Sequence, residues 1–595
     1  MSAHHKAPGS IALLIVAMSA LFSLAMFRGL EHSAGYGGSV YQVLHPGSFP
    51  GDRFMSLFRP TMVSAYYLLV KLVGDVWLDD RFTIVVFAAL AVLALAGVDK
   101  TVQLLGGRRT GERVAMLSLI FVAHRVLDNQ AQLLGSEFNA TLFSSPLNIW
   151  LLYWCLAGPR PLVVIPLMVL ILSLSVKNGW LPCLITGVLL WKERLRPRGQ
   201  VIAVAATGLL GVLAWLGYAA FLRRPDGTDV ALFDYLHREL ENAEADPFLN
   251  PLAANLVFVG LCLAGMMVKG LPDAVSVRLR ILAGTGLAVW LAGGLYLSSA
   301  PDPIKIPYLV PLDVTRALWW IQYVMGAALG VALLKWLQRT ASSAGVCVAW
   351  GLLMGLYLVH ETFRAKLAAV VAVVTLVMVG MAWRRNVSDT LRPVVSPREK
   401  CLARFAGLPG VLSARTRLRI VAVAMCLGTL SLYSVGIVHR RWDALAFLVR
   451  HGIVGDNSGA IWVEVNPYIR EHTPASATVF ALASRNALGE PWGLRYEGSL
   501  RNRTGRSMPL GSASAFYVDY QDVQWLKAQR RHVQLVVEAW ELQDLAGVST
   551  HLAALGSPDY LVVPIEESAW LREQPDFGYQ FETARGAYGI FRRRS

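Results

Sequence analysis

The chain has 595 residues, of which 55% are hydrophobic and only 16% are charged. Soluble domains carry about 25% charged residues, so the composition excludes an ordinary soluble enzyme and predicts a polytopic α-helical membrane protein. The formal net charge of +15 is typical of basic cytoplasmic loops that fix membrane topology, which explains it better than nucleic-acid binding does.

Thirteen apolar segments are long enough to cross a bilayer, which takes about 20 residues of helix. They lie near residues 10–28, 81–98, 113–128, 141–157, 161–176, 179–192, 200–220, 251–269, 279–298, 316–335, 344–358, 366–383 and 419–438. No small-residue cleavage site and soluble domain follow the first segment, so we interpret it as a retained span rather than a signal peptide.

One further apolar run, "TMVSAYYLLVKLVG" at 61–74, is short for a span and contains Lys71. If this run lies on the membrane surface, the loop "GGRRTGER" falls inside and agrees with the other basic loops. An excess of Lys and Arg in inner loops sets orientation. We therefore predict an inner-membrane protein with a cytoplasmic N-terminus, an outer C-terminus and a juxtamembrane helix at 61–74 on the outer face.

This topology places residues 29–80 in one long outer loop. In its middle, the stretch "HPGSFPGDRFMSLFRP" carries a carboxylate, Asp52, among prolines and glycines that limit its freedom. An acid in a stiff loop at the point where the chain leaves the lipid is a candidate functional residue. The alternative is that Asp52 forms a turn or caps a helix, which is common for Asp in such sequences.

Ionisable residues also collect at the predicted outer ends of later spans, whereas the inner ends have few acids. They are His124, Arg125, Asp128, Glu137, Lys177, Arg316, His360, Glu361 and Arg364. Any one of them could extend along the apolar surface to the headgroups. Their collection on one face instead indicates a site at the outer mouth of the bundle.

From about residue 440 the composition changes to mixed charge, which predicts a small α/β domain over 441–595, outside the membrane. "PYIREHTPASATVFALAS" indicates a helix and a strand, "HLAALGSPDYLVVP" a buried strand, and "GYQFETARGAYGIFRR" a hairpin. No cysteine follows Cys426, so this domain has no disulfides. Residues 1–440 then form the transmembrane domain.

The usual catalytic and nucleotide-binding signatures are missing from the sequence. It contains no Walker loop, no GxSxG, no HExxH and no EF-hand loop, and its six cysteines form no zinc-like spacing. The chemistry must therefore come from side chains at the outer end of the helices.

The order of these elements resembles the GT-C superfamily of membrane glycosyltransferases, and in particular the lipid A aminoarabinose transferases and the protein O-mannosyltransferases. The pattern is a first span, an outer loop with an acid ("FPGDRF"), a juxtamembrane helix ("RPTMVSAYYLLVKLVG") and a second span that ends in a basic loop ("DDRFTIVVFAALAVLALAGVDKTVQLLGGRR"). Those relatives usually pair two acids in the loop. Here Gly51 and Arg53 flank Asp52, and the pair Asp79–Asp80 follows the juxtamembrane helix.

The resemblance implies a hexosyl- or pentosyltransferase that moves a sugar from a polyprenyl-phosphate donor to a cell-envelope acceptor. Asp52 would act as the general base, while Lys177, Arg316 and Arg364 would hold the leaving phosphate. The other substrate-binding candidates are Glu31, Arg53, His124, Asp128, Glu137 and His360. No cofactor is predicted, and a divalent metal is not expected without a second nearby acid.

The implied partners are the lipid-linked donor, a glycan, lipid or protein acceptor, membrane lipids and envelope polysaccharide assembly proteins. One alternative is a transporter or flippase for a lipid-linked glycan. Another is an assembly subunit in which "RYEGSLRNRTGRS", with Arg495, Arg501, Arg503 and Arg506, is a docking or glycan-binding loop. That stretch could equally be a solvated surface loop.

Overall fold

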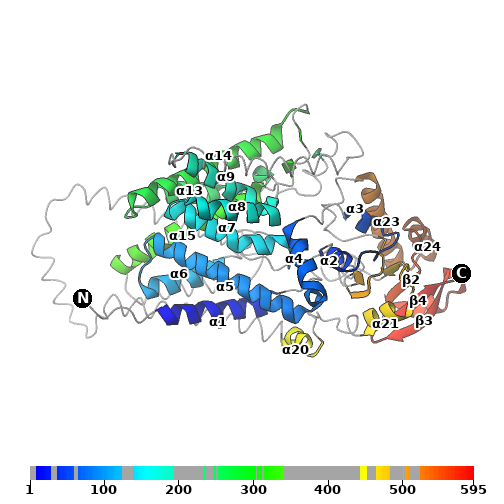
Figure 1. The fold of residues 1–595 in the computed structure, drawn as a ribbon. Coiled ribbons are helices and arrows are strands. Elements are labelled where there is room, and N and C mark those ends of the chain that lie inside the picture. Colours follow the sequence, from blue (N-terminus) through cyan, green and yellow to red (C-terminus); the bar gives the residue numbers. More distant parts are fainter. Residues whose placement is uncertain are drawn as a thin grey trace, which may run out of the picture.

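The structure, a computed structural model, combines a helical bundle with a small C-terminal sheet (Figure 1). It describes residues 8–27, 36–58, 64–123, 138–192, 233–234, 246–249, 252–302, 305–306, 309–310, 314–340, 442–451, 464–482, 500–501, 503–509 and 523–594.

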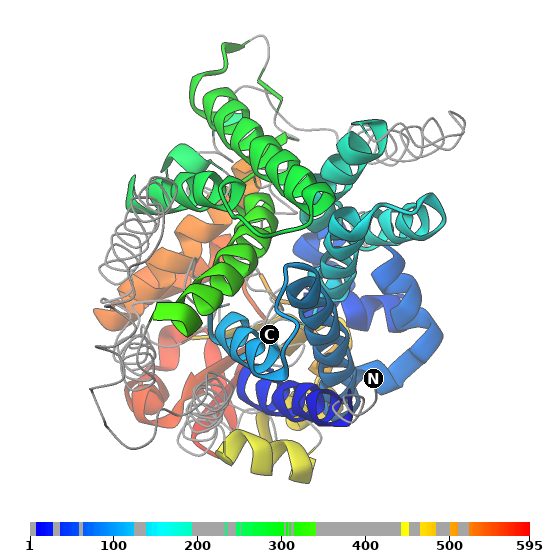
Figure 2. The same cartoon turned by 90° about the vertical axis from the view of Figure 1, so that its left-hand side faces the viewer.

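Long apolar helices form the bundle, and Figure 2 views them from the end opposite the sheet. They are α1 (Pro8–Met26), α5 (Asp80–Leu104), α6 (Thr110–Ala123), α7 (Ala140–Ala157), α8 (Pro161–Leu174), α9 (Val176–Lys192), α13 (Leu252–Met266), α14 (Asp273–Ser299) and α15 (Val314–Thr340). Among the described residues, α5, α7 and α14 are long and apolar enough to cross a membrane, which confirms a helical membrane class. The predicted spans at 200–220, 344–358, 366–383 and 419–438 lie outside the described residues, so the total of thirteen stays a prediction.

Close packing of α5 against α7 fixes the relative heights of the helices. A Cβ on Gly97 would lie 2.8 Å from Ile149, so glycine lets the two backbones approach. Phe27, just after α1, contacts both Phe87 of α5 and Phe138, just before α7. The ends of α1 and α7 nearest the sheet are therefore level with Phe87. Because α5 begins at Asp80, it extends about 10 Å further toward the sheet, at about 1.5 Å per residue.

Four short helices connect α1 to α5 at the end of the bundle near the sheet. They are α2 (Tyr36–Leu44), α3 (Arg53–Phe58), α4 (Ala65–Val73) and the 3-10 helix η2 (Gly74–Leu78). The run 61–74, predicted as a juxtamembrane helix, contains α4, whose nine residues are too few to span. One side of α4 buries Tyr66 and Val70 in the bundle core, whereas Leu68 and Leu72 are exposed.

The C-terminal part, residues 442–594, contains a four-stranded mixed sheet, while its first helix packs against α5 of the bundle, where Arg81 Nε donates to the carbonyl of Leu448. Its elements are α20 (Trp442–His451), α21 (Asn466–His472), β1 (Val479–Ala481), α23 (Val523–Glu541), α24 (Leu545–Ala554), β2 (Tyr560–Pro564), α25 (Ile565–Arg572), η10 (Pro575–Phe577), β3 (Tyr579–Arg585) and β4 (Tyr588–Arg593). The strand order is β1-β2-β4-β3, with β1 parallel to β2 and the other neighbours antiparallel. The strands and hairpin predicted from the sequence are present, while the boundary at 440 stays a prediction.

Alternating side chains of β2 face two separate cores. Leu561 and Val563 pack with α23 and α24, whereas Tyr560 and Val562 pack on the opposite face with α21 and residues near Met508. This is the period-two pattern of a strand buried on both faces. The core beside α23 and α24 also takes in Phe49, Phe54 and Met55 from the first loop. The first loop therefore packs into the C-terminal part.

Candidate functional site

The loop that carries Asp52 is a tight turn between α2 and α3. Gly47 and Gly51 have positive φ angles, as does the buried Phe49 (φ 61°), whose ring is held in the core beside α23. Asp52 stands directly before α3, and its Oδ1 accepts the N–H of Met55 at 3.0 Å. This is the N-cap bond that Asp favours at a helix start, and it corresponds to the helix-cap interpretation of this residue.

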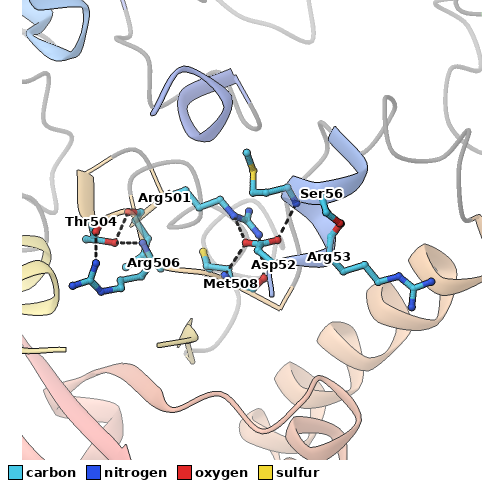
Figure 3. A network of polar contacts seen from close by, with 9 residues as sticks. Asp52, Arg53, Ser56, Arg501, Thr504, Arg506 and Met508 are labelled. Atoms are coloured by element: carbon cyan, nitrogen blue, oxygen red, sulfur yellow. Dashed lines mark hydrogen bonds and ion pairs between the residues drawn. The ribbon is translucent and has the colours of Figure 1, made fainter. Parts of the chain in front are cut away.

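The second carboxylate oxygen of Asp52 pairs with the C-terminal part (Figure 3). Oδ2 accepts Nε of Arg501 at 2.9 Å and the backbone N–H of Met508 at 3.2 Å. Asp52 is 4% exposed and Arg501 is 1% exposed. Both charges of this pair are thus removed from water and depend on each other.

Further contacts hold Arg501 in place. Its Nη2 donates to the carbonyl of Met508 at 3.1 Å, and its guanidinium lies 4.8 Å from the ring centroid of Phe54. A Cβ on Gly38 would lie 3.2 Å from Arg501 Cδ, so a glycine in α2 leaves room for the arginine stem. Arg501 is therefore enclosed by elements from both halves of the chain.

Two more contacts join the same regions. Nη2 of Arg503 lies 3.0 Å from Oδ2 of Asp80, which is fully buried at the start of α5, while Nη1 donates to the carbonyl of Leu78. Arg53 stacks over Trp525 of α23 at 5.0 Å. The two acids at the ends of segment 52–80 thus pair with two arginines that are two residues apart in the sequence.

The last arginine of this stretch stabilises the C-terminal part itself. Arg506 donates to Thr473 Oγ1 and to the carbonyls of Arg470, Thr473 and Thr504. Burial lowers the pKa of its guanidinium from the ordinary value. Arg501, Arg503 and Arg506 are therefore engaged within the protein and not displayed on a solvated loop, while Arg495 lies outside the described residues.

This arrangement limits what Asp52 can do chemically in the state described. A general base must lie within about 2.6–3.2 Å of the proton it takes, and three donors already occupy the carboxylate oxygens. Base catalysis would require the Arg501 pair to open. No group of three or more His, Cys, Asp or Glu that could hold a metal comes together among the described residues.

The other predicted site residues divide into two groups. Glu31, His124, Asp128, Glu137, His360 and Arg364 lie outside the described residues. Lys177 is half-buried in the first turn of α9, and Arg316 lies in the first turn of α15, where only its backbone is described.

A buried polar cluster connects the starts of α9 and α15 to α7. The Asn178 side chain donates to the hydroxyls of Ser144 and Ser145, and the Asn178 backbone carbonyl accepts from Asn148 Nδ2 and from Trp320 Nε1, each at 3.0 Å. Proline at position 182 explains why that carbonyl is available. It has no N–H to donate to the carbonyl four residues earlier, and side chains from neighbouring helices replace the missing bond.

The cluster also sets the height of Lys177 in the bundle. Asn178 is level with Ser144 and Ser145, which lie four and five residues into α7, or about 6–8 Å from its sheet end at about 1.5 Å per residue. The backbone of Lys177 therefore lies more than one helical turn deeper in the bundle than Phe87, measured from the end nearest the sheet. Lys177 thus lies near the end of α9 that faces the sheet, beside the buried Asn178 cluster.

The comparisons with known proteins add little to this geometry. No family model and no curated protein matches the chain. Among solved structures, the chain is similar to the crystal structure of ArnT from Cupriavidus metallidurans in the apo state, with 14% identity, a TM-score of 0.38 and 98% of each chain covered. ArnT is a lipid A aminoarabinose transferase, one of the groups that the order of elements resembles.

Proposed function

We propose that the chain is a membrane glycosyltransferase that moves a sugar from a polyprenyl-phosphate donor to a cell-envelope acceptor on the outer face of the membrane. The observation that supports it best is the hydrogen bond between Trp320 and Asn178. Lys177 precedes Asn178 directly, and Arg316 lies one helical turn before Trp320. The backbones of two cationic residues therefore lie within one helical turn of this hydrogen bond. Lysine and arginine bind phosphate strongly, and placed cations stabilise a leaving phosphate.

The surroundings of these cations suit a donor with an apolar chain and a charged head. The helices around them are apolar, and α4 exposes Leu68 and Leu72, which would face lipid. The first loop and the C-terminal part cover the same end of the bundle (Figure 1) and would provide the side that faces water. In this proposal the end nearest the sheet is the outer end.

Asp52 is the general base in this proposal. It acts only after it separates from Arg501 and the first loop moves toward the cations. The movement is needed because Lys177 lies deeper in the bundle than Phe87, whereas Asp80, which pairs with the same arginine segment as Asp52, lies about 10 Å outside that level. An acceptor hydroxyl would then occupy the position that the guanidinium holds in the closed state.

Asp52→Asn should lower transfer about 10²–10⁴-fold, the usual contribution of a general base, without changing donor binding. Arg501→Met breaks the same ion pair but keeps the carboxylate, so it should lower transfer much less. Equal transfer by the Asp52→Asn variant and the parent would mean that Asp52 only holds the first loop against the C-terminal part, through Arg501 and Met508.

The donor site is tested by binding of radiolabelled polyprenyl phosphate to the purified full chain in nanodiscs. Lys177→Met should weaken binding about 10- to 150-fold, because a hydrogen bond to a charged group contributes about 1.5–3 kcal/mol. Lys192→Met is the matched control, since Lys192 is exposed in the last turn of the same helix. Absence of binding to the parent chain, or equal losses in both variants, would refute the donor site. Movement of the lipid across the membrane without sugar transfer would favour the flippase alternative.

A further inference from the structure

Two histidines meet between α23 and α24, away from the cations and acids considered so far. His532 lies in α23 and His551 in the last turn of α24, and both are half-buried. Their Nδ1 atoms are 3.4 Å apart, and their ring centroids are 5.5 Å apart. Val533 and Val548 pack in the core that the two helices share, so the backbones that carry the imidazoles are held in place.

The distance between the two nitrogens is long for a hydrogen bond and matches the spacing of two ligands of one metal ion. Protein N–H hydrogen bonds are usually about 2.7–3.2 Å long, so 3.4 Å is a weak contact. In a tetrahedral zinc site with Zn–N bonds of about 2.0–2.1 Å, two ligand nitrogens are about 3.3–3.4 Å apart. The imidazoles are therefore already spaced as two corners of such a tetrahedron.

We propose that His532 and His551 bind a late first-row transition-metal ion, with Zn²⁺ as the reference case. Imidazole nitrogen is a preferred ligand for these ions. Both rings would bind through Nδ1 with their protons on Nε2, since a ligating imidazole is neutral. The described residues supply no third His, Cys, Asp or Glu, so water completes the coordination, which makes this an open site. The proposal does not depend on the transferase function.

A metal here would connect two helices of the C-terminal part. The ion fastens the middle of α23 to the last turn of α24. Trp525 lies seven residues before His532, two turns away on the same side of α23, and it is the residue that stacks on Arg53. A bound ion should therefore stiffen the helix against which the first loop packs.

Isothermal titration of Zn²⁺ into the full chain tests the site. The protein is purified in detergent without a histidine tag, and His4 and His5 are changed to Gln in every sample because they are adjacent and could bind metal themselves. One Zn²⁺ should bind, and His532→Gln and His551→Gln should each weaken binding at least about tenfold, because even the loss of a residue that only orients a ligand costs about 10- to 100-fold. His472→Gln is the control, since His472 is exposed on α21 and stacks on Tyr468.

Hydrogen exchange of the amides in residues 533–537 gives a second readout. It is measured on the parent chain, so it does not depend on whether the histidine variants fold. At a free Zn²⁺ concentration about 100 times the Kd, opening of this segment in the parent chain should slow about 100-fold. Binding that is equal in the parent and in the double His532→Gln/His551→Gln variant would overturn the proposal. So would exchange in the parent that does not respond to Zn²⁺, which would leave the two rings as an N–H···N contact.

Discussion

The buried pair of Asp52 and Arg501 leads to a quantitative prediction about the joint between the bundle and the C-terminal part. Asp52→Asn keeps a good N-cap residue for α3 but removes the negative charge. Arg501→Met keeps an apolar stem over Phe54 but removes the positive charge. Each change leaves a buried partner uncompensated, which typically costs about 3–5 kcal/mol. The equilibrium constant for opening the joint should rise about 200- to 4,000-fold in each single variant.

The double variant separates the pair from its surroundings. Because neither charge remains, its loss should be smaller than the sum of the two single losses by at least about 2 kcal/mol, within the range of coupling energies for residues in contact. Arg53→Met is the control at the same joint. It removes an exposed cation–π contact with Trp525, which contributes about 0.5–1 kcal/mol, and it leaves no buried charge behind.

Thiol reactivity at position 507 provides the assay. Ser507 is 1% exposed, its hydroxyl has no hydrogen-bond partner among the described residues, and it follows Arg506 directly, so Ser507→Cys changes little in the closed state. In a background without the six native cysteines, the labelling rate reports how often this segment opens. Additive effects of the two single changes, or rates that do not differ from the parent, would refute the reasoning that the two charges depend on each other.

Three further predictions address the packing and the surface of the molecule. Gly97→Ala should separate α5 from α7 and cost about 1–3 kcal/mol, whereas Gly284→Ala, with open space around its Cβ, should not, as thermal unfolding in detergent will show. Burial raises the pKa of Tyr579 to about 12, so the unfolded chain loses this proton first and the contribution of Tyr579 to stability should fall between about pH 10 and 12; Tyr579→Phe should make the loss of stability over this pH range smaller, and the remainder belongs to other tyrosines whose pKa values are raised, such as Tyr468. Asn178→Leu should weaken polyprenyl-phosphate binding by releasing the start of α9, and binding unchanged from the parent would show that the cluster does not position Lys177.

Elements with a local signal were predictable from the sequence. The run 61–74 is too short to span, and it forms α4. The strand "YLVVP" and the terminal hairpin have the composition and turn residues of strands, and they form β2, β3 and β4. These features depend on neighbours in the sequence, so periodicity and turn chemistry are sufficient to find them.

The pairing of acids with arginines could not be predicted in the same way. Asp52 and Arg501 are 449 residues apart in the sequence, and no local rule selects one partner among the many basic residues of the chain. The stretch that contains Arg501 and Arg503 stood out for its charge, but charge alone equally predicts a solvated loop. The Asn178 cluster is similar, because polar residues and prolines within apolar spans are visible in the sequence while their partners on other helices are not.

The two ion pairs also determine how the first loop can move. Arg501 and Arg503 belong to one short segment of the C-terminal part, and they hold Asp52 and Asp80 at the two ends of the segment that contains α3, α4 and η2. Separating either pair leaves a buried charge that only water or another charge can satisfy. Opening either pair therefore requires a ligand or solvent to take the place of a guanidinium. In the proposed transferase, an acceptor that reaches Asp52 would have to displace Arg501, so the proposal couples acceptor entry to the position of the C-terminal part through a single side chain.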